Sequence, residues 1–407
     1  MQKRFTPDEG GVFPEWEEVE FGKLFQRRSE KNGDEFGVDK TISVATMHFK
    51  PEGNKAAEES LPKYRVLRKG DIAYEGNKSK HFKHGRFVLN DIGDGIISPI
   101  FEVLQPVSEL SKEVPEFWKY YINYEPVMGK ILAKCANTGI MMNRLAIKDF
   151  YKQKIKVPCI EEQRKIAAAL AAYDEMIAVK TAKLETWQEC KKRMVKEIFG
   201  RTKRFKDDDG REFPEWEEKT LGEISEPLKY GMSAAAVKYD GENKYLRITD
   251  IDEASRKYVS DKIASPEASK IAEKFLVQKN DLLFARTGAS VGKTYLYDET
   301  DGKMYYAGYL IKAHIKPEYD SQFIFQLTLT NEFKKWVKKE SMRTAQPGIN
   351  AECLAKYKMM IPCMEEQQKI GSFLAEIDKE IQIQKEFIKT YAEGKKRMMR
   401  ELMEKCN

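Results

Sequence analysis

Two long windows of the chain place apolar residues at spacings that alternate between four and three. Each window is interrupted at two matched places, by Lys180 and Lys191 in the first and by Gln384 and Lys395 in the second. The apolar positions are Ile166, Leu170, Tyr173, Ile177, Leu184, Trp187 and Met194, then Ile370, Leu374, Ile377, Ile381, Ile388, Tyr391 and Met398. A heptad pattern sustained over this length predicts the seam of a coiled coil. At about 1.5 Å per residue, each predicted helix of about 40 residues is roughly 60 Å long.

Each window follows a proline, Pro158 in the first and Pro362 in the second, and two glutamates come soon after it. Proline is favoured at a helix start, and carboxylates in the first turn interact favourably with the helix dipole. Two such helices in one chain most simply pair with each other. The long segment between them can return the chain, so we expect antiparallel pairing. The alternative is an ordinary two-helix dimerisation stalk.

The two helical windows belong to an internal duplication, which governs how the whole chain is organised. Residues 157–198 and 361–402 are identical at 18 of 42 positions without a gap. A second repeat begins at Arg4-Phe5 and ends in the hexapeptide FPEWEE, and it returns 200 residues later. Because the two ends of the chain occupy equivalent places in the repeat, we expect them to lie close together in a pseudo-twofold arrangement.

The stretches enclosed by these repeats have diverged. Residues 25–135 and 225–335 barely align, apart from short echoes such as KGDI at 69–72 and KNDL at 279–282. The chain therefore alternates variable and constant blocks. We predict a first domain over 1–157, a central helical spacer over 158–200, a second domain over 201–361 and a C-terminal helical spacer over 362–407.

Each enclosed domain mixes short strand-like runs with helical ones. Arg86–Leu89 and Asp281–Phe284 are strand-like, and a helix opens at Glu116–Tyr121. We expect the aromatic residues of that helix to pack in the core rather than stack on bases. The predicted fold class is α+β, with two α/β domains separated by two long helices that form an antiparallel coiled coil.

The stretch FARTGASVGKTY, residues 284–295, is similar to a P-loop, G-x-x-x-x-G-K-[ST], whose backbone N–H groups cradle phosphates. Its end is present as Gly292-Lys293-Thr294, but Thr287 stands where the first glycine belongs. A P-loop also requires a helix directly afterwards, whereas the run that follows here is β-like. We interpret the stretch as a hairpin tip that contacts DNA. The alternative is a purely structural glycine turn.

Polar and basic side chains gather in the loops of both domains and just before each helical window. Such side chains hydrogen-bond base edges and phosphates. The candidate DNA-contacting residues are Lys78, Lys80, His81, Lys83, His84, Arg86, Asn143, Arg144, Arg286, Thr287, Ser290, Lys293, Arg343, Thr344 and Gln346. The alternative for the basic loop of the first domain is a solvated surface. His81 and His84 lack the further nearby ligands that a metal site needs.

Composition narrows the classes of function. The chain has 407 residues, of which 41% are hydrophobic, so it should fold into two or three domains. A net charge of +6 permits a nucleic-acid partner without establishing one. Six cysteines without a C-x-x-C pair indicate free thiols in a reducing cytosol. With no signal peptide and no membrane-spanning run, we expect a cytoplasmic protein.

Taken together, these features resemble the specificity (S) subunit of type I restriction-modification systems, over essentially the whole chain. The resemblance is carried by the doubled Pro-x-x-Glu-Glu-Gln blocks with their heptad helices, the doubled FPEWEE, the echo of KGDI in KNDL and the run RTGASVG at 286–292. It implies that each enclosed domain is a target recognition domain, which reads one half of a split, asymmetric DNA site. The paired helices would then act as a ruler that sets the gap.

The resemblance also implies that the chain has no catalytic activity and no cofactor or metal of its own. Its partners would be double-stranded DNA, two methyltransferase (M) subunits and, in the full complex, motor-nuclease (R) subunits. Those subunits would carry the S-adenosylmethionine, ATP and magnesium chemistry. The first domain lacks the RTGASVG loop and has Glu75-Gly76-Asn77 instead, so its reading residues do not carry over from the second domain.

Two other classes of protein are the alternatives. An adenine methyltransferase would need an N/D-P-P-Y/F motif, which this sequence lacks, and a motor would need a true P-loop with acidic magnesium ligands. A coiled-coil scaffold, or another component of a DNA-modification system, would explain the helices. It would not explain why the enclosed domains diverged and carry polar, basic loops.

Overall fold

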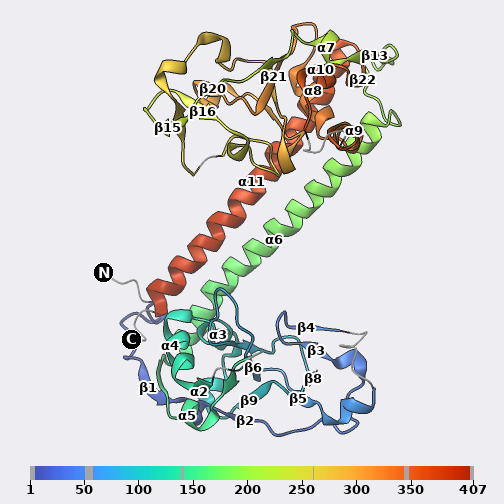
Figure 1. Ribbon diagram of the computed structural model, residues 1–407. Helices are drawn as coiled ribbons and strands as arrows, with labels where there is room; N and C mark the ends of the chain where they lie inside the picture. Colours follow the sequence, from blue (N-terminus) through green and yellow to red (C-terminus); the bar gives the residue numbers. More distant parts are fainter. Residues whose placement is uncertain are drawn as a thin grey trace. The chain divides into compact units, whose positions relative to one another are not determined.

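The computed structural model describes residues 5–50, 58–137, 139, 142–259, 261–342 and 348–403. They form two compact units, Met1–Val179 with Phe387–Asn407, and Lys180–Glu386. The long helices α6 (Ile160–Phe199) and α11 (Met364–Met403) each contribute one half to each unit (Figure 1). Their predicted length of about 40 residues is confirmed. None of the helices in the described ranges combines the length and apolarity of a membrane span.

The first unit is built on a four-stranded antiparallel sheet. Its strand order is β2 (Phe25–Arg27), β9 (Glu102–Pro106), β6 (Ile72–Glu75) and β7 (Arg86–Leu89). Smaller ladders pair β1 (Glu17–Glu20) with β12 (Lys154–Val157), β3 (Ile42–Ser43) with β4 (His48–Phe49), β5 (Arg65–Leu67) with β8 (Gly95–Ile97), and β10 (Ala136–Asn137) with β11 (Arg144–Leu145). The short helices are α1 (Phe21–Leu24), α2 (Glu109–Lys112), α3 (Pro115–Tyr121), α4 (Glu125–Cys135) and α5 (Ile147–Tyr151). Strand β7 has the bounds that the sequence predicted.

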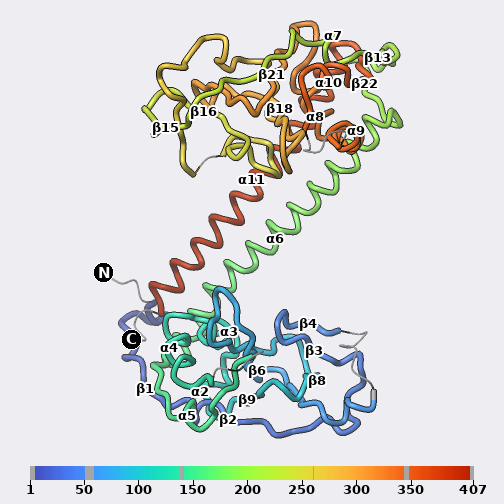
Figure 2. Tube along the Cα trace, viewed as in Figure 1, coloured from blue at the N-terminus to red at the C-terminus, as the bar shows by residue number. Residues whose placement is uncertain are grey.

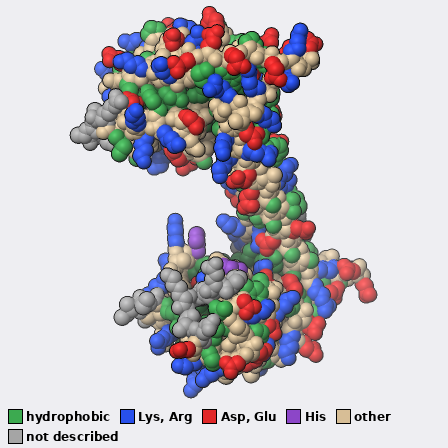
Figure 3. Space-filling model, turned by 90° about the vertical axis from the view of Figure 1, so that its right-hand side faces the viewer, with side chains coloured by type: hydrophobic (Ala, Val, Ile, Leu, Met, Phe, Trp, Pro, Cys, Tyr) green, Lys and Arg blue, Asp and Glu red, His purple; other side chains and the backbone are tan. Residues whose placement is uncertain are grey.

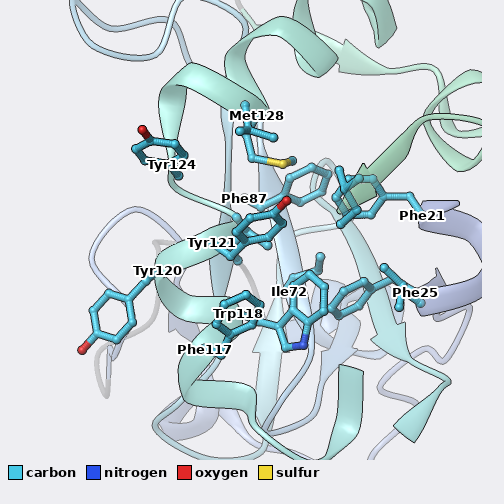
Figure 4. Close-up of a cluster of buried hydrophobic side chains, with 14 of the residues drawn as sticks. Phe21, Phe25, Ile72, Phe87, Phe117, Trp118, Tyr120, Tyr121, Tyr124 and Met128 are labelled. Atoms are coloured by element: carbon cyan, nitrogen blue, oxygen red, sulfur yellow. The ribbon is translucent and has the colours of Figure 1, made fainter. Parts of the chain in front are cut away.

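Aromatic side chains of α3 form much of the core of this unit. Phe117, Trp118 and Tyr121 are fully buried. They lie near side chains from the sheet such as Phe25, whereas the ring of Tyr120 points away from this cluster (Figure 4). The Trp118 ring meets Phe25 edge-on, with 5.0 Å between the ring centroids. The prediction that these aromatic residues pack in the core is confirmed.

The second unit is built on a sheet of the same kind (Figure 2). Its strand order is β14 (Lys229–Tyr230), β21 (Leu310–His314), β18 (Asp281–Ala285) and β19 (Thr294–Leu296). Smaller ladders pair β13 (Glu217–Thr220) with β22 (Lys358–Ile361), β15 (Ala236–Lys238) with β17 (Ala264–Pro266), and β16 (Lys244–Leu246) with β20 (Met304–Tyr306). The short helices are α7 (Leu221–Ile224), α8 (Ser321–Thr328), α9 (Asn331–Ser341) and α10 (Ala351–Ala355).

One buried aspartate occupies the same place in both sheets and explains the short sequence echo between the two domains. Asp71 and Asp281 lie at the start of the strands β6 and β18, and both are almost fully buried. Each carboxylate accepts the backbone N–H of the residue three positions earlier, Arg68 at 2.9 Å and Gln278 at 2.8 Å. Each also pairs with a basic side chain from a neighbouring segment. The retained aspartate therefore fixes the turn into the strand.

In the first unit, the beginning of α6 packs against the end of α11. Ile166 and Leu170 belong to the same core cluster as Met403, and Met398 packs against that cluster. Phe5, the first described residue, packs against it as well. The two ends of the described chain therefore share one core, as the duplication predicted.

In the second unit, the end of α6 packs against the beginning of α11. Met194 and Ile198 share a core cluster with Ile370 and Leu374. Antiparallel helices exchange halves in this way, because the start of one meets the end of the other. Every predicted seam side chain is buried or half-buried. The prediction that the two helices of one chain pair with each other is confirmed.

Two ion pairs link the helices at equivalent positions. In the first unit, the ammonium of Lys395 lies 2.5 Å from the carboxylate of Asp174. In the second unit, Lys191 lies 2.6 Å from Asp378. Residues 174 and 378 are equivalent in the duplication, and so are 191 and 395. The structure thus makes the same lysine–aspartate pair twice.

The repeated FPEWEE segment is tied to the start of each long helix. The indole N–H of Trp16 donates to Glu162 at 3.1 Å, and that of Trp216 donates to Glu366 at 3.1 Å. Both glutamates are almost fully buried. A buried carboxylate without a donor would destabilise the fold. This requirement gives a physical reason for the retention of both tryptophans and both glutamates.

Candidate nucleic-acid interface

The predicted contact loops are the tips of two equivalent β-hairpins. Strands β6 and β7 enclose residues 76–85, and strands β18 and β19 enclose residues 286–293. The two hairpins occupy the same place in their sheets. The prediction that FARTGASVGKTY forms a hairpin tip is therefore confirmed. Loops held on a rigid sheet are a common place for binding residues.

The first loop presents a cluster of basic side chains to solvent. Lys78, Lys80, His81 and Lys83 are exposed, and His84 is half-buried. In Figure 3, histidine and lysine or arginine side chains stand out from the surface of this unit, the lower one in the view. A cationic surface of this kind suits phosphate groups, whose charge it neutralises with release of counterions.

Arg86, at the end of the same loop, is engaged within the domain. Its Nε donates to the Glu75 carboxylate at 2.7 Å, and its Nη2 donates to the carbonyl of Ala45 at 2.6 Å. The guanidinium carbon lies 5.3 Å from the centre of the Phe82 ring. Glu75 is buried and balances the charge of Arg86. Arg144, by contrast, is exposed.

The polar segment before α6 lies against this loop. The backbone N–H of Asn143 donates to the carbonyl of Gly76 at 2.8 Å, and its side-chain amide donates to the carbonyl of Lys83 at 3.1 Å. A Cβ on Gly76 would come within 2.0 Å of the Asn143 carbonyl, so the close approach requires glycine. Asn143 is only 3% exposed. In this structure it holds the loop in place.

The glycines of the second loop serve backbone geometry. Gly288 and Gly292 have φ of +72° and +79°, a region that residues with a Cβ rarely adopt. A Cβ on Gly292 would also lie 2.6 Å from the side chain of Val337 on α9. Thr294 then begins a strand rather than a helix. The geometry that lets a P-loop bind phosphates at a helix N-terminus is therefore not formed here.

Arg286 follows directly after β18, and its guanidinium stacks on an aromatic ring. The guanidinium carbon lies 4.9 Å from the centre of the Tyr230 ring. Within the described part of the chain, no carboxylate forms an ion pair with it. Thr287 forms a bridge with Gly348, and the N–H of Ile349 donates to the Arg286 carbonyl at 2.9 Å. The segment before α11 thus lies against the second loop, as Asn143 lies against the first.

Lys293 has its ammonium group turned into the domain. It is 8% exposed, and Nζ donates to the carbonyl of Ile251 at 3.0 Å. The same group lies 3.0 Å from the carboxylate of Glu253. Burial acts in the opposite direction, but the hydrogen bond from Lys293 and the charge of Arg256 hold the pKa of Glu253 below its ordinary value. Lys293 thus ties the loop to a neighbouring segment.

A cavity of about 460 Å³ lies beside the second loop. Ser290 lines it, together with Arg256 and two lysines of α9, Lys334 and Lys338. The two lysines are four residues apart and therefore share one face of the helix. Sequence reasoning missed both of them. In the sequence they appear only as part of the polar face of an amphipathic helix. Such a face is equally typical of a helix that merely contacts solvent, so it does not indicate a binding surface.

Arg343, Thr344 and Gln346 lie outside the described residues. For each of the other candidates, contact with DNA stays a prediction.

Among the residues that are described, no group of three or more histidine, cysteine, aspartate or glutamate side chains is arranged to hold a metal ion. The five described cysteines carry free thiols.

The duplicated organisation matches a known family. The sequence profile described as "Type I restriction modification DNA specificity domain" matches residues 14–186 and again residues 214–390. The chain belongs to this family. It is a type I restriction-modification specificity subunit, and the resemblance drawn from the sequence is confirmed. Each matched region begins inside one FPEWEE segment and ends within a long helix. This specificity subunit therefore carries the family's domain twice.

Two archaeal relatives are similar to this specificity subunit. The type I restriction enzyme MjaVIII specificity subunit of Methanocaldococcus jannaschii is 25% identical over 325 residues, which are 76% of this chain and 73% of the relative. The putative type I restriction enzyme MjaX specificity subunit of the same organism is 24% identical over 426 aligned positions, 99% of this chain and 96% of the relative. The similarity therefore extends over nearly the full length of both chains in the second case.

Two solved structures share the fold. The type I restriction-modification S subunit from M. genitalium has a TM-score of 0.63 at 15% identity, with 98% of each chain covered. A chain from a structure that concerns complex assembly and conformational transition of the type I R-M system has a TM-score of 0.51 at 17% identity. That match covers 97% of this chain and 98% of the other. The predicted α+β fold class with two repeated domains is confirmed.

Proposed function

We propose that this specificity subunit is the non-catalytic DNA-reading component of a type I restriction-modification complex. In this proposal each target recognition domain reads one half of a split, asymmetric sequence. The observation that carries it is the pair of equivalent hairpins with unlike tips. One tip holds exposed lysines and histidines, and the other holds Arg286 and the glycine-rich turn. Two unlike readers imply two unlike half-sites.

The paired helices would set the gap between the half-sites. Support comes from the heptad seam and from the lysine–aspartate pair that is made twice. The two domains have diverged, whereas the two helices that frame them have been retained. This pattern suits a protein whose recognition domains change their target while the spacing between them is kept. In proteins that read two half-sites, the geometry of the protein fixes the half-site spacing.

The chemistry would belong to partner subunits. We propose that two methyltransferase subunits dock on this chain, that motor-nuclease subunits join the full complex, and that the assembly acts in the cytoplasm. S-adenosylmethionine, ATP and magnesium would then be bound by those partners, and this chain would need no cofactor. The sequence supports a non-catalytic role, since it contains no Pro-Pro dipeptide and hence no N/D-P-P-Y/F motif.

A binding selection tests this proposal. The chain, co-purified with a type I methyltransferase partner, is incubated with a library of random DNA duplexes, and the bound fraction is sequenced. We expect enrichment of two different short sequences separated by a gap of fixed length and arbitrary sequence. Enrichment of one contiguous sequence, or of none, would contradict the proposal.

A further inference from the structure

We propose that Arg286 reads a guanine in the half-site of the second domain and that Tyr230 is its positioning residue. This inference rests on the proposed DNA-reading function and makes it specific. It concerns one side chain at the tip of one hairpin, and it assigns a base to that side chain.

The charge of Arg286 is available for a ligand. Most arginines near the domain cores form ion pairs with carboxylates, as do Arg28, Arg65, Arg68, Arg86, Arg204, Arg247 and Arg256. Arg286 has no such partner in the described part of the chain. It also lies on the hairpin loop that the proposed function places against DNA. A positive charge left without a carboxylate at that position suits an external acceptor.

The backbone at Arg286 is fixed on both sides. Its N–H donates to the carbonyl of Tyr309 at 3.0 Å, and its carbonyl accepts the N–H of Ile349 at 2.9 Å. Arg286 also follows immediately after β18, a central strand of the sheet whose side chains are buried. The guanidinium therefore starts from a rigid platform rather than from a mobile loop.

The side chain is oriented by Tyr230. Its guanidinium carbon lies 4.9 Å from the centre of the Tyr230 ring, a distance typical of cation–π stacking. The Tyr230 ring is itself anchored, because its hydroxyl accepts the N–H of Ala351 at 3.0 Å. Tyr230 remains 41% exposed and Arg286 is half-buried, so part of the pair reaches the surface. Such pre-organisation lowers the entropy lost when the guanidinium binds.

The chemistry of the guanidinium points to guanine. Arginine donates two parallel hydrogen bonds to O6 and N7 of guanine, and this is the commonest specific contact in the major groove. A correct bidentate contact discriminates against the wrong base by about 5- to 150-fold. Lysine would supply the same charge but not the planar pair of donors.

The first domain does not repeat this arrangement, although its hairpin is equivalent. The sheet register aligns Gly76 with Arg286, so no side chain is present at that position. Arg86 stacks on Phe82, but its Nε already donates to Glu75 and its Nη2 to the carbonyl of Ala45. The contact that Arg286 makes should therefore have no counterpart at the equivalent position of the first domain.

The test compares the base preference of variants at each position of the bound motif. The methyltransferase complex is assembled with the wild-type chain, Arg286→Ala or Arg286→Lys, and bound sequences are selected from random duplexes. We expect both variants to lose the preference for one guanine by about 5- to 150-fold while the other half-site is unchanged. Arg286→Lys keeps the charge, so its overall affinity should fall less than that of Arg286→Ala.

Substitutions at Tyr230 test its positioning role. Tyr230→Phe keeps the ring but removes the hydroxyl that anchors it. It should therefore weaken the guanine preference less than Tyr230→Leu, which removes the ring itself. As a matched control, Lys274→Ala removes another cation that stacks on an aromatic ring of this domain, 5.0 Å from the centre of Phe275. It should leave the motif as it is. Thermal unfolding of each complex shows whether any variant has lost its fold.

Three outcomes would overturn the inference. Uniform weakening at all sequences, with a smaller salt dependence, would mean that Arg286 contacts a phosphate. A preference for guanine that survives Arg286→Ala would assign the reading to another residue, and Tyr230→Leu with an unchanged preference would remove the positioning role. A wild-type chain that selects no split sequence would instead contradict the proposed function itself.

Discussion

At the scale of single residues, two basic side chains seven positions apart in one loop serve opposite purposes. Arg286 stacks on Tyr230 with no carboxylate partner in the described chain. Lys293 is buried and hydrogen-bonded to the carbonyl of Ile251. Their residue type and spacing do not reveal this difference. The fold of the hairpin decides it, because it places Arg286 against the partly exposed ring of Tyr230 and turns Lys293 toward a neighbouring segment.

Lys293→Met should destabilise the second unit. The substitution keeps most of the apolar stem and removes the ammonium, so the buried carbonyl of Ile251 loses its donor. The expected loss is about 1–3 kcal/mol. The ion pair with Glu253 adds little, since that carboxylate is largely exposed. Thermal unfolding followed by tryptophan fluorescence measures the change.

Arg286→Ala is the matched comparison. It removes a cation–π contact and no buried hydrogen bond, so it should change stability by no more than about 1 kcal/mol. A larger loss of stability for Arg286→Ala than for Lys293→Met would contradict the roles that the structure assigns to these two residues.

The glycine-rich loop should not bind ATP. Its glycines serve left-handed turns and a close approach to α9, and a strand follows where a P-loop has a helix. Isothermal titration calorimetry of the isolated chain with ATP and magnesium should detect no binding. Tight binding that is lost in Lys293→Met would show that the loop is a nucleotide site after all.

Some of the site could be predicted at this scale and some could not. Gly292-Lys293-Thr294 followed by a β-like run was enough to predict a hairpin tip instead of a P-loop. The inward direction of Lys293, and the role of Asn143 in holding the first loop, depend on tertiary contacts with segments far away in the sequence. No local pattern contains that information.

At the scale of elements, the retained lysine–aspartate pair joins more than the two helices. In the second unit, Asp378 accepts a hydrogen bond from Gln326 of α8 as well as the ion pair from Lys191. In the first unit, Asp174 accepts one from Tyr120 of α3. Burial raises the pKa of Tyr120 above its ordinary value, and the hydrogen bond to Asp174 raises it further. Each aspartate therefore ties the helix pair to the enclosed domain beside it.

Charge reversal tests this junction. Lys191→Glu places two carboxylates together and should lower stability by about 1 kcal/mol, because the side chains are only partly exposed. The double variant Lys191→Glu with Asp378→Lys restores an opposite pair and should recover part of the loss. Thermal unfolding of the wild-type chain, Lys191→Glu, Asp378→Lys and the double variant gives the coupling between the two positions. Additive losses in the double variant would show that the pair does not stabilise the helices.

Shortening both helices tests the ruler. Removing residues 176–182 and 380–386 deletes one heptad from each helix at equivalent places and preserves the seam. The helices shorten by roughly 10 Å, which corresponds to about three base pairs. Binding selection should return the same half-sites with a shorter gap.

A control and a contrary result complete that experiment. Deletion from α6 alone shifts one helix past the other by two turns, so it should break the ion pairs and destabilise the chain. An unchanged gap after the double deletion would contradict the ruler. Loss of both half-sites at once would indicate a folding defect, which thermal unfolding identifies.

The helices were predictable from the sequence and the sheets largely were not. A heptad repeated over 40 residues leaves a strong periodic signal, and the duplication supplied it twice. The strands of both sheets have only two to five residues. Such short runs carry little periodicity. The common strand order became visible only through pairing between segments that are distant in the sequence.

At the scale of the whole molecule, the two halves of the duplication share the same kind of sheet but differ in the residues at the hairpin tips. The two sheets share their strand order, their buried aspartate and the loop at the end of the central strand. The residues on the two hairpin tips differ in charge, size and pairing. This combination is what a reader of two unlike half-sites requires. The two ends of the described chain, near Phe5 and Met403, meet in one core.

The most direct test of this account is the methylome of cells that express this chain together with its methyltransferase partner. Single-molecule sequencing of their genomic DNA should reveal adenine methylation at one new motif, made of two different half-sites separated by a gap of fixed length. Cells with the partner alone provide the control. Absence of any new motif, or methylation at a single uninterrupted sequence, would contradict the account.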